Sequence, residues 1–205
     1  LVRSGLAHRT LRDRGGNPES LAPLARELGF GIIEVPPLRL GGRAVSSTAV
    51  REAVSLGDLK GAAIMLGRPM SVLGTVVRGD GRGKALGFPT ANLDLHHELH
   101  PPAGVYAAFA LLDGALRPAA VNIGRKPTFG GGEEAVEVHL LDGAGDLYGR
   151  DLEVFFLERL RGEQSFPNPE LLRAQIAADI EQARGVIGAA SRHWRIPGRY
   201  LPIES

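Results

Sequence analysis

The 205-residue sequence has no cysteine, few aromatic residues and almost no net charge. The absence of cysteine excludes disulfides and thiolate metal sites and fits a reducing compartment, so we expect a cytoplasmic protein. A formal charge of +1, from 24 basic and 23 acidic side chains, gives no electrostatic support for a nucleic-acid partner. No run approaches about 18 consecutive apolar residues and no basic-then-apolar leader is recognisable, so we expect no membrane partner either.

An apolar fraction of 43% and frequent glycine and proline indicate a globular chain with one ordinary domain or two small ones. Residues 1–67 alternate between helix and strand signals. A helix is predicted from Pro18 to a stop at Gly29, then a short apolar strand and two more helices, the last bracketed by Asp58 and Gly67. This order is typical of part of an α/β unit that buries too little surface to fold alone.

The character of the sequence changes at Ser71. Five short apolar runs, rich in β-branched residues and separated by glycine, proline and aspartate turns, predict five or six strands in a small barrel or sandwich. A helix with Asn168 as its cap follows, and its apolar residues recur at helical spacing: Leu172, Ile176, Ile180, Ala183 and Ile187. The fold class is therefore α+β, and residues 191–205 are left as a tail.

The glycine-rich segment "GDGRGKALGFPTANL", residues 79–93, matches neither of the two common phosphate loops. A Walker A loop requires a hydroxyl residue after its lysine, but Lys84 is followed by Ala85. The dinucleotide fingerprint requires a third glycine where Lys84 stands, and we expect the chain after it to be extended rather than helical. Both P-loop and Rossmann binding are therefore excluded.

The residue types of this segment still suit a polyphosphate. Glycines allow backbone N–H groups to approach a ligand closely, and Arg82 and Lys84 add positive charge. Thr90 and Asn92, two residues apart on an extended chain, direct two neutral oxygens to one side, which suits Mg²⁺ already bound to phosphates. The alternative is a tight hairpin in which both side chains bond their own backbone. The spacing alone leaves these two interpretations open.

The same segment resembles the signature of riboflavin kinase domains. The likeness continues in order through "GVYAAFALLDG", "AAVNIGRKPTFGG", "VEVHLLD", "DLYGRDLEVFFLERLRGEQSF" and "LLRAQIAADIEQAR", so it covers about residues 68–184. Upstream, "VSSTAVREAVSLGDLKGAAIMLGRP" is similar to the closing part of the FAD synthetase nucleotidyltransferase module that bacteria fuse to this kinase. The chain thus resembles the C-terminal two thirds of a bifunctional riboflavin kinase and FAD synthetase.

The resemblance implies a fold and a reaction. It implies a six-stranded antiparallel Greek-key barrel with a C-terminal helix over residues 68–190, preceded by a partial nucleotidyltransferase module over residues 1–67. The implied reaction moves the γ-phosphoryl group of ATP to the 5′-hydroxyl of riboflavin, giving FMN and ADP with Mg²⁺ as cofactor. The module's H-x-G-H motif is absent from these 205 residues, so we expect the chain as it stands not to make FAD. The alternative is a flavin-binding module that keeps the barrel without catalysis.

The resemblance also implies the roles of particular residues. Glu137 falls on the catalytic base, and Thr90 and Asn92 fall on the metal ligands. Strand alternation agrees for Glu137, because it places this carboxylate on the face opposite Val136 and Val138. The implied ATP-phosphate residues form one loop: Gly79, Gly81, Arg82, Gly83, Lys84, Gly87 and Thr90.

Two further groups of residues follow from the resemblance. Positions near the flavin and nucleotide are Asn122, Arg125, Arg161 and Phe166. An adenylyltransferase phosphate element comprises Ser46, Ser47, Thr48 and Arg51, at a helix start where free N–H groups favour anions. From the residues alone, an arginine after a strand is an ordinary surface residue and the serine-rich element an ordinary helix cap, so both interpretations stay open.

Overall fold

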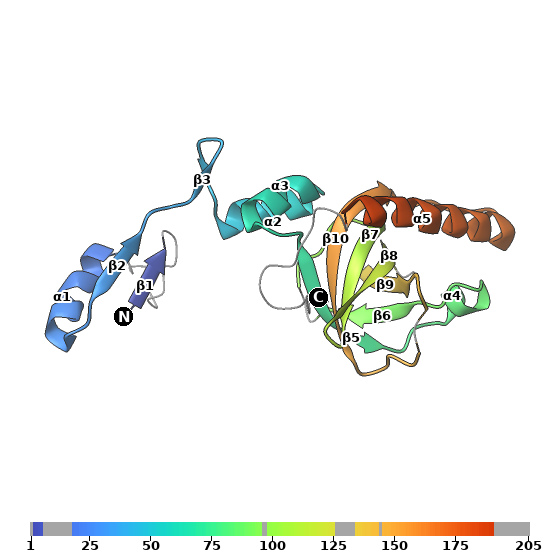
Figure 1. Ribbon diagram of the computed structural model, residues 1–205, viewed down its shortest axis with the longest axis horizontal. Helices are drawn as coiled ribbons and strands as arrows, with labels where there is room; N and C mark the ends of the chain where they lie inside the picture. The colour runs from blue at the N-terminus through green and yellow to red at the C-terminus, as the bar shows by residue number, and fades with distance from the viewer. Residues whose placement is uncertain (1, 6–17, 96–97, 126–133, 144, 191–205) are drawn as a thin grey trace, which may run out of the picture. The chain divides into compact units, whose positions relative to one another are not determined.

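The computed structural model (Figure 1) describes five stretches of the chain: residues 2–5, 18–95, 98–125, 134–143 and 145–190. The chain forms two compact units, Leu1–Val50 and Arg51–Ser205. The predicted domain boundaries at residues 67 and 190 are not tested by this division and stay predictions. The predicted tail lies outside the described residues.

The first unit combines short strands with one helix. Its elements are β1 (Val2–Gly5), α1 (Pro18–Leu28), β2 (Ile32–Val35), β3 (Arg39–Leu40) and β4 (Arg43–Ala44). β1 and β2 pair in parallel, and β3 and β4 form a small antiparallel hairpin. The helix begins at Pro18 and stops before Gly29, whose φ is 69°, so the prediction for this helix is confirmed. Its assignment to a nucleotidyltransferase module stays a prediction.

Two capped helices, α2 (Ser47–Ser55) and α3 (Leu59–Leu66), follow. The Oγ of Ser46 accepts a hydrogen bond from the N–H of Ala49 at 3.2 Å, so this serine caps α2. Asp58 caps α3 by accepting from the N–H of Gly61 at 2.8 Å, and Gly67 ends it with φ 69°. Both predicted helices are confirmed, and the caps explain where they start.

The second unit is built on a closed six-stranded barrel. Its strands are β5 (Ser71–Val77), β6 (Ala91–Asp94), β7 (Gly104–Leu112), β8 (Ala115–Arg125), β9 (Glu134–Leu140) and β10 (Asp151–Arg161). All pairs are antiparallel, in the order β10-β5-β6-β9-β8-β7. Because β7, β8 and β9 are consecutive neighbours and β10 returns beside β7, the strands form a Greek key. The barrel implied by the resemblance is confirmed.

Alternate residues of these strands fill the barrel interior. Tyr106 and Phe156 are buried there, with their rings edge to face at a centroid distance of 5.4 Å. The Tyr106 hydroxyl donates to the carbonyl of Pro102, and burial raises the pKa of this phenol despite the opposing charge of Arg159. Val121 and Val138, paired across β8 and β9, are also fully buried. These side chains form a packed core inside the barrel.

Helix α5 (Pro169–Ala190) adds a second layer on the outside of the barrel (Figure 1). Asn168 caps it by accepting from the N–H of Leu171 at 2.9 Å, as predicted. Ala183 and Ile187 of the helix pack with outward residues of β7, β8 and β10, such as Phe109, in a cluster of buried side chains. The helix thus covers part of the barrel's outer surface.

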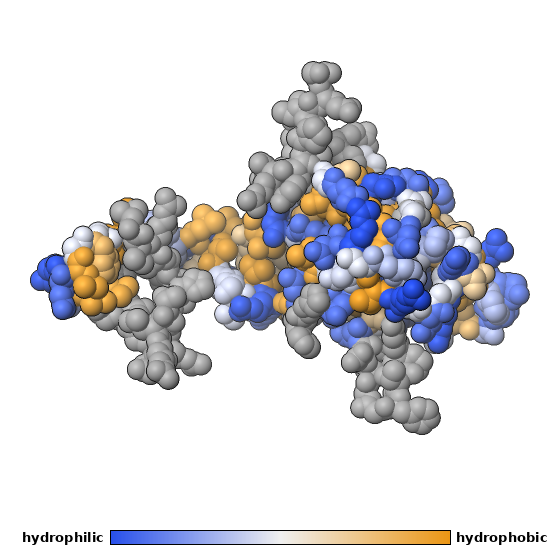
Figure 2. Space-filling view, turned by 90° about the horizontal axis from the view of Figure 1, so that it is seen from below, coloured by the Kyte–Doolittle hydropathy of each residue, from blue (hydrophilic) through white to orange (hydrophobic). Residues whose placement is uncertain are grey.

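The outer surface mixes hydrophilic and hydrophobic residues. Figure 2 shows blue hydrophilic side chains interspersed with smaller orange areas on one face of the second unit. None of the helices among the described residues is long and apolar enough to cross a membrane.

We expect the barrel interior to dominate the stability of the second unit. Phe156→Ala should lower the free energy of unfolding by about 3–5 kcal/mol, because the packed interior cannot collapse into the space left behind. Urea denaturation measures this change. Leu171→Ala, at a residue of α5 that is 50% exposed, is the matched control and should change stability by less than ~0.5 kcal/mol. Similar losses in the two variants would contradict the packing described.

Candidate functional site

A row of paired residues runs across neighbouring strands on the outer face of the barrel. Asn92 of β6 pairs with Glu137 of β9, and Glu137 pairs with Asn122 of β8. The row continues through Val105 of β7 to Arg161 of β10. Directly paired residues face the same side of a sheet with their Cβ atoms about 5 Å apart. The strands therefore bring together four of the polar residues that the resemblance implied.

The outward direction of this row follows from strand alternation. Val136 and Val138 are 2% and 1% exposed and belong to the barrel interior, while Glu137 between them is half-buried on the opposite face. The predicted orientation of Glu137 is thus confirmed. Two residues further on, the Nδ1 atom of His139 lies 2.8 Å from the carbonyl oxygen of Pro89, which holds this imidazole against the loop before β6.

The row opens into a cleft of about 310 Å³ between the barrel and α5, here named the helix-side cleft. Its polar lining comes from the row and the glycine-rich segment: Thr90, Asn122, Glu137, Arg161, Arg82 and Gly83. Its apolar lining includes residues of α5 and the loop before it, Leu172, Ile176, Ile180 and Phe166, and residues of the barrel strands, Val105, Ala120 and Ala135. The cleft thus combines charged and polar groups with apolar surface.

The glycine-rich segment forms a compact turn before β6. A short helix, α4 (Arg82–Ala85), follows Gly81, whose φ is 69°. The N–H of Phe88 donates back to the carbonyl of Gly83 at 2.8 Å, and Gly87 has φ 90°. Gly81 in the left-handed region turns the chain, and one helical turn follows it that was not predicted. After Ala85 the helix does not continue, and the chain becomes extended in β6 (Ala91–Asp94).

Two glycines of the segment allow a close approach to the candidate metal ligands. A Cβ on Gly79 would lie 2.1 Å from Nδ2 of Asn92, and one on Gly83 would lie 3.0 Å from Oγ1 of Thr90 and 2.5 Å from the carbonyl oxygen of Phe88. A side chain at Gly79 would collide with the Asn92 side chain, and one at Gly83 would collide with the Phe88 carbonyl and the Thr90 side chain. The loop therefore packs its backbone directly over Thr90 and Asn92.

A second cleft of about 560 Å³, here named the loop-side cleft, lies on the other side of Thr90. It is lined by backbone and side-chain atoms of the glycine-rich segment and β6: Gly79, Gly81, Lys84, Thr90 and Asn92. Tyr148 also lines it, and the guanidinium of Arg78 lies 5.5 Å from the centre of that ring. Because Thr90 lines both clefts, they meet at this residue.

Asn92 has the environment of a ligand side chain. It is 8% exposed, and its Oδ1 atom is buried with no hydrogen-bond partner among the residues that the structure describes. A buried amide oxygen without a donor loses free energy unless another group satisfies it. A hard cation bound at Oδ1 would do so, and the threonine hydroxyl two residues earlier is a ligand of the same oxygen type. The residues present therefore fit Mg²⁺.

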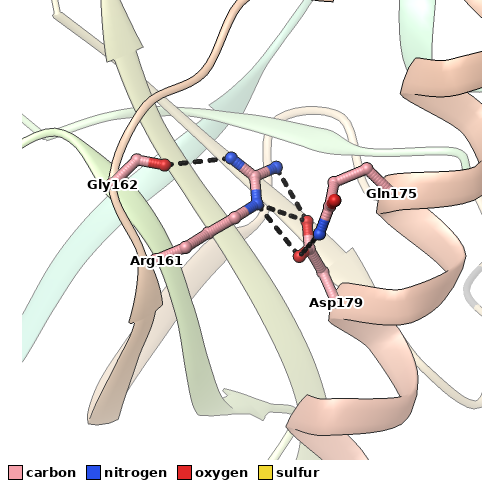
Figure 3. Close-up of polar contacts among 4 residues, drawn as sticks. All are labelled: Arg161, Gly162, Gln175 and Asp179. Carbon is pink, nitrogen blue, oxygen red and sulfur yellow. Dashed lines mark hydrogen bonds and ion pairs between the residues drawn. The ribbon is translucent and has the colours of Figure 1, made fainter.

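Arg161 is held by an ion pair with Asp179 of α5 (Figure 3). The pair is bidentate: Nη2 of Arg161 donates to Oδ2 of Asp179 at 2.8 Å, and Nε of Arg161 donates to Oδ1 of Asp179 at 3.0 Å. Nε2 of Gln175 also donates to Oδ1 of Asp179, at 2.9 Å. The guanidinium carbon lies 5.7 Å from the centre of the Phe166 ring. Arg161 and Phe166, implied as flavin neighbours, thus lie together in the helix-side cleft.

The other residues that the family resemblance implied are not part of the polar row. Arg82 lies 3.5 Å from Asp80 in an exposed ion pair, and Gly87 is not among the residues that line the two clefts. For Arg125 the structure describes the backbone, which pairs with Glu134 at the end of β8. Ser46 is the cap of α2, and Ser47, Thr48 and Arg51 lie in that helix. Their implied role in phosphate binding stays a prediction.

Sequence reasoning missed Asp179 and Glu163, which line the helix-side cleft. It also missed Gln175, which donates to Asp179. A signal for Asp179 existed, since this carboxylate lies among the apolar residues Ile176, Ile180 and Ala183 that mark the buried face of the helix. A charge at such a position requires a partner. The partner was not predictable from spacing, because Arg161 lies on another element.

Comparisons with known proteins show what the chain is similar to. The family model described as riboflavin kinase matches residues 66–187. A bifunctional riboflavin kinase/FMN adenylyltransferase of Escherichia coli strain K12 is 42% identical over 176 residues, which cover 85% of this chain and 56% of that protein. The protein of the same name from Pseudomonas fluorescens is 41% identical over 182 residues, covering 88% and 58%. The chain thus spans little more than half the length of these relatives.

A solved structure is similar as well. A crystal structure described as a macrolide-efflux protein from Streptococcus pneumoniae aligns with a TM-score of 0.66 and 32% sequence identity. The alignment covers 84% of this chain and 54% of that one. The likeness supports the arrangement of strands and helices described above.

The contact between Gly79 and Asn92 gives a direct test of the site. In Gly79→Ala the new methyl group should displace the Asn92 amide, which NMR detects as a shift of its side-chain N–H resonances. We expect a loss of only about 1 kcal/mol in stability, because an amide end can rotate aside. Gly185→Ala is the control, since a Cβ there meets no atom within 4 Å. An unmoved Asn92 amide in Gly79→Ala would contradict the packing of this loop.

Proposed function

The chain belongs to the riboflavin kinase family, and from that premise we propose that it transfers the γ-phosphoryl group of ATP to the 5′-hydroxyl of riboflavin, giving FMN and ADP. One observation carries the proposal. Thr90 lies where two clefts meet, and Asn92 and Glu137 are paired directly beside it. A phosphoryl acceptor and a phosphoryl donor held in separate clefts would meet at these residues.

The chemistry of the two clefts supports one assignment of the substrates. The loop-side cleft offers glycine backbone and the Lys84 ammonium, which suit the phosphates of ATP. The helix-side cleft offers apolar side chains of α5 and the Phe166 ring, which suit a planar uncharged flavin. ATP therefore binds on the loop side and riboflavin on the helix side, with the ribityl chain directed along the polar row.

Thr90 and Asn92 would hold Mg²⁺ at the junction. When bound, the ion neutralises charge on the phosphates during transfer. Two protein oxygens are sufficient, because Mg²⁺ usually keeps waters and substrate oxygens among its ligands. The tight packing of Gly79 on the Asn92 amide orients this side chain before any ligand arrives. Thr90 and Asn92 thus fix where the phosphates lie.

Glu137 is the proton acceptor in this proposal. Its carboxylate lies between Asn92 and Asn122 in the row, half-buried and open to the helix-side cleft. As the 5′-oxygen of riboflavin forms its bond to the γ-phosphorus, the bond from phosphorus to the ADP oxygen breaks, and the hydroxyl proton passes to the Glu137 carboxylate. Asn122, on the other side of Glu137, can hydrogen-bond the ribityl chain and orient it.

The remaining assignments extend the proposal. Arg125, at the end of β8, is assigned to the flavin and nucleotide vicinity from the family resemblance. We assign the residues before β5 to the closing part of an FMN adenylyltransferase module, in which Ser46, Ser47, Thr48 and Arg51 bind phosphate. The names of the curated relatives support a bifunctional protein of this kind. We place the reaction in the cytoplasm.

The proposed function is tested by incubating the purified chain with riboflavin, ATP and Mg²⁺ and separating flavins by chromatography. We expect FMN and ADP in equal amounts. Riboflavin binding without ADP formation would instead indicate a flavin-binding module that no longer transfers phosphate. A folded protein that neither binds riboflavin nor makes FMN would exclude both.

Removal of the proton acceptor should affect the chemical step. We expect Glu137→Gln to lower kcat by about 10²–10⁴-fold with little change in KM for either substrate, because the amide cannot accept the proton. Steady-state kinetics measure both constants. The control is Glu134→Gln on the same strand, whose carboxylate is instead ion-paired with His100 at 3.1 Å. Near-normal turnover in Glu137→Gln would remove the proposed role.

The metal ligands should control the Mg²⁺ requirement. A chelator should abolish FMN formation, and Asn92→Ala should raise the Mg²⁺ concentration for half-maximal rate by about tenfold, equivalent to ~1.4 kcal/mol of metal binding. Excess Mg²⁺ should restore much of the rate, and KM for riboflavin should be unchanged. An unaltered Mg²⁺ dependence in Asn92→Ala would show that the ion binds elsewhere.

A further inference from the structure

Asp179 is a buried ionisable residue for which the proposed reaction has no use. It lies in the middle of α5, is 4% exposed and lines the helix-side cleft. Both carboxylate oxygens are bonded (Figure 3): Oδ1 accepts from Nε of Arg161 and Nε2 of Gln175, and Oδ2 accepts from Nε and Nη2 of Arg161. The carboxylate is therefore satisfied and points at the arginine.

Arg161 joins three parts of the cleft. It is the last residue of β10, its Nη1 donates to the Gly162 carbonyl at 3.0 Å at the start of the next loop, and its other nitrogens bond α5 through Asp179. Its guanidinium also lies against Phe166, which is in that same loop. Arg161 thus links the Phe166 ring to α5 through its ion pair with Asp179.

The ion pair is difficult to explain by stability alone. Apolar side chains Ile176 and Ile180 flank Asp179 in the cleft wall, and in such surroundings a buried pair gains little over apolar residues of the same volume. An ordinary helix face would complete this wall with another aliphatic residue. The bidentate geometry and the added Gln175 bond instead fix the plane and the direction of the guanidinium.

From these contacts we infer that Asp179 and Gln175 are positioning residues that hold the Arg161 guanidinium against Phe166 as a charge-neutral wall of the helix-side cleft, suited to an uncharged planar ring. The inference rests on the proposed function, because it names the flavin ring as the group that meets this wall. Neutralisation matters, since a free guanidinium would favour anions over riboflavin. Arg161 thus shapes the flavin site and is not free for the phosphates of ATP.

The test measures riboflavin binding to the full chain by quenching of flavin fluorescence, without ATP, so that binding is separated from catalysis. We expect Asp179→Asn to weaken riboflavin binding by about tenfold, because the guanidinium loses its charged anchor. Lumiflavin, which has the ring without the ribityl chain, should lose affinity by the same factor. The affinity for Mg-ADP should stay within about twofold, which a general loosening of the fold would not allow.

Two further variants complete the experiment. Glu181→Gln, on the same helix with an exposed carboxylate 3.7 Å from Arg184, should leave all affinities unchanged. If Asp179→Asn fails to fold, the double variant Asp179→Leu with Arg161→Met replaces the pair by apolar residues of similar volume. It should fold and still bind riboflavin and lumiflavin about tenfold more weakly than the unmodified chain.

Each outcome decides between the inference and the proposed function. If the unmodified chain makes FMN and the Asp179 variants bind riboflavin as tightly as it does, the inference is wrong and the proposed function stands. If the variants lose riboflavin and Mg-ADP affinity alike, the residue maintains the fold and the positioning role is wrong. If the unmodified chain binds no riboflavin, both are wrong.

Discussion

The strand register of the barrel is the constraint on which the site depends. Asn92, Glu137 and Asn122 form a polar row because they are paired across three neighbouring strands. A slip of one residue would turn their side chains toward the interior and bring apolar ones out. The buried residues Val136 and Val138, which alternate with Glu137, make such a slip costly. The apolar core therefore positions the polar site.

The outer surface of the barrel that faces α5 has two parts, one packed against the helix and one that lines the helix-side cleft. Along one part of it, α5 buries residues such as Phe109 and Phe155 against Ala183. Beyond that cluster the helix and the barrel face each other across the helix-side cleft, where Ile176 of the helix lines the wall opposite the polar row. One helix thus contributes to both the packed layer and the candidate flavin site, and the Arg161 contact marks the transition between them.

Much of this fold could be predicted from local pattern. The caps at Asp58 and Asn168 and the apolar spacing of α5 were correct, because these signals depend only on nearby residues. Helix α4 was missed, since an element of four residues shows no period. Strand β6 (Ala91–Asp94) was expected only as an extended chain around Asn92 and was not among the five apolar runs. The roles of Glu137 and its neighbours came from the family resemblance. Their pairing across strands could not be predicted, because it depends on the register of strands that are far apart in the sequence.

The most direct test of the central claim is a crystal structure of the chain with FMN, ADP and Mg²⁺. We expect the ion about 2.0–2.1 Å from the side-chain oxygens of Thr90 and Asn92. The flavin ring should lie in the helix-side cleft, with the Glu137 carboxylate within about 2.6–3.2 Å of the 5′-oxygen. An ion bound away from Thr90 and Asn92, or a flavin outside the helix-side cleft, would contradict this assignment of the site.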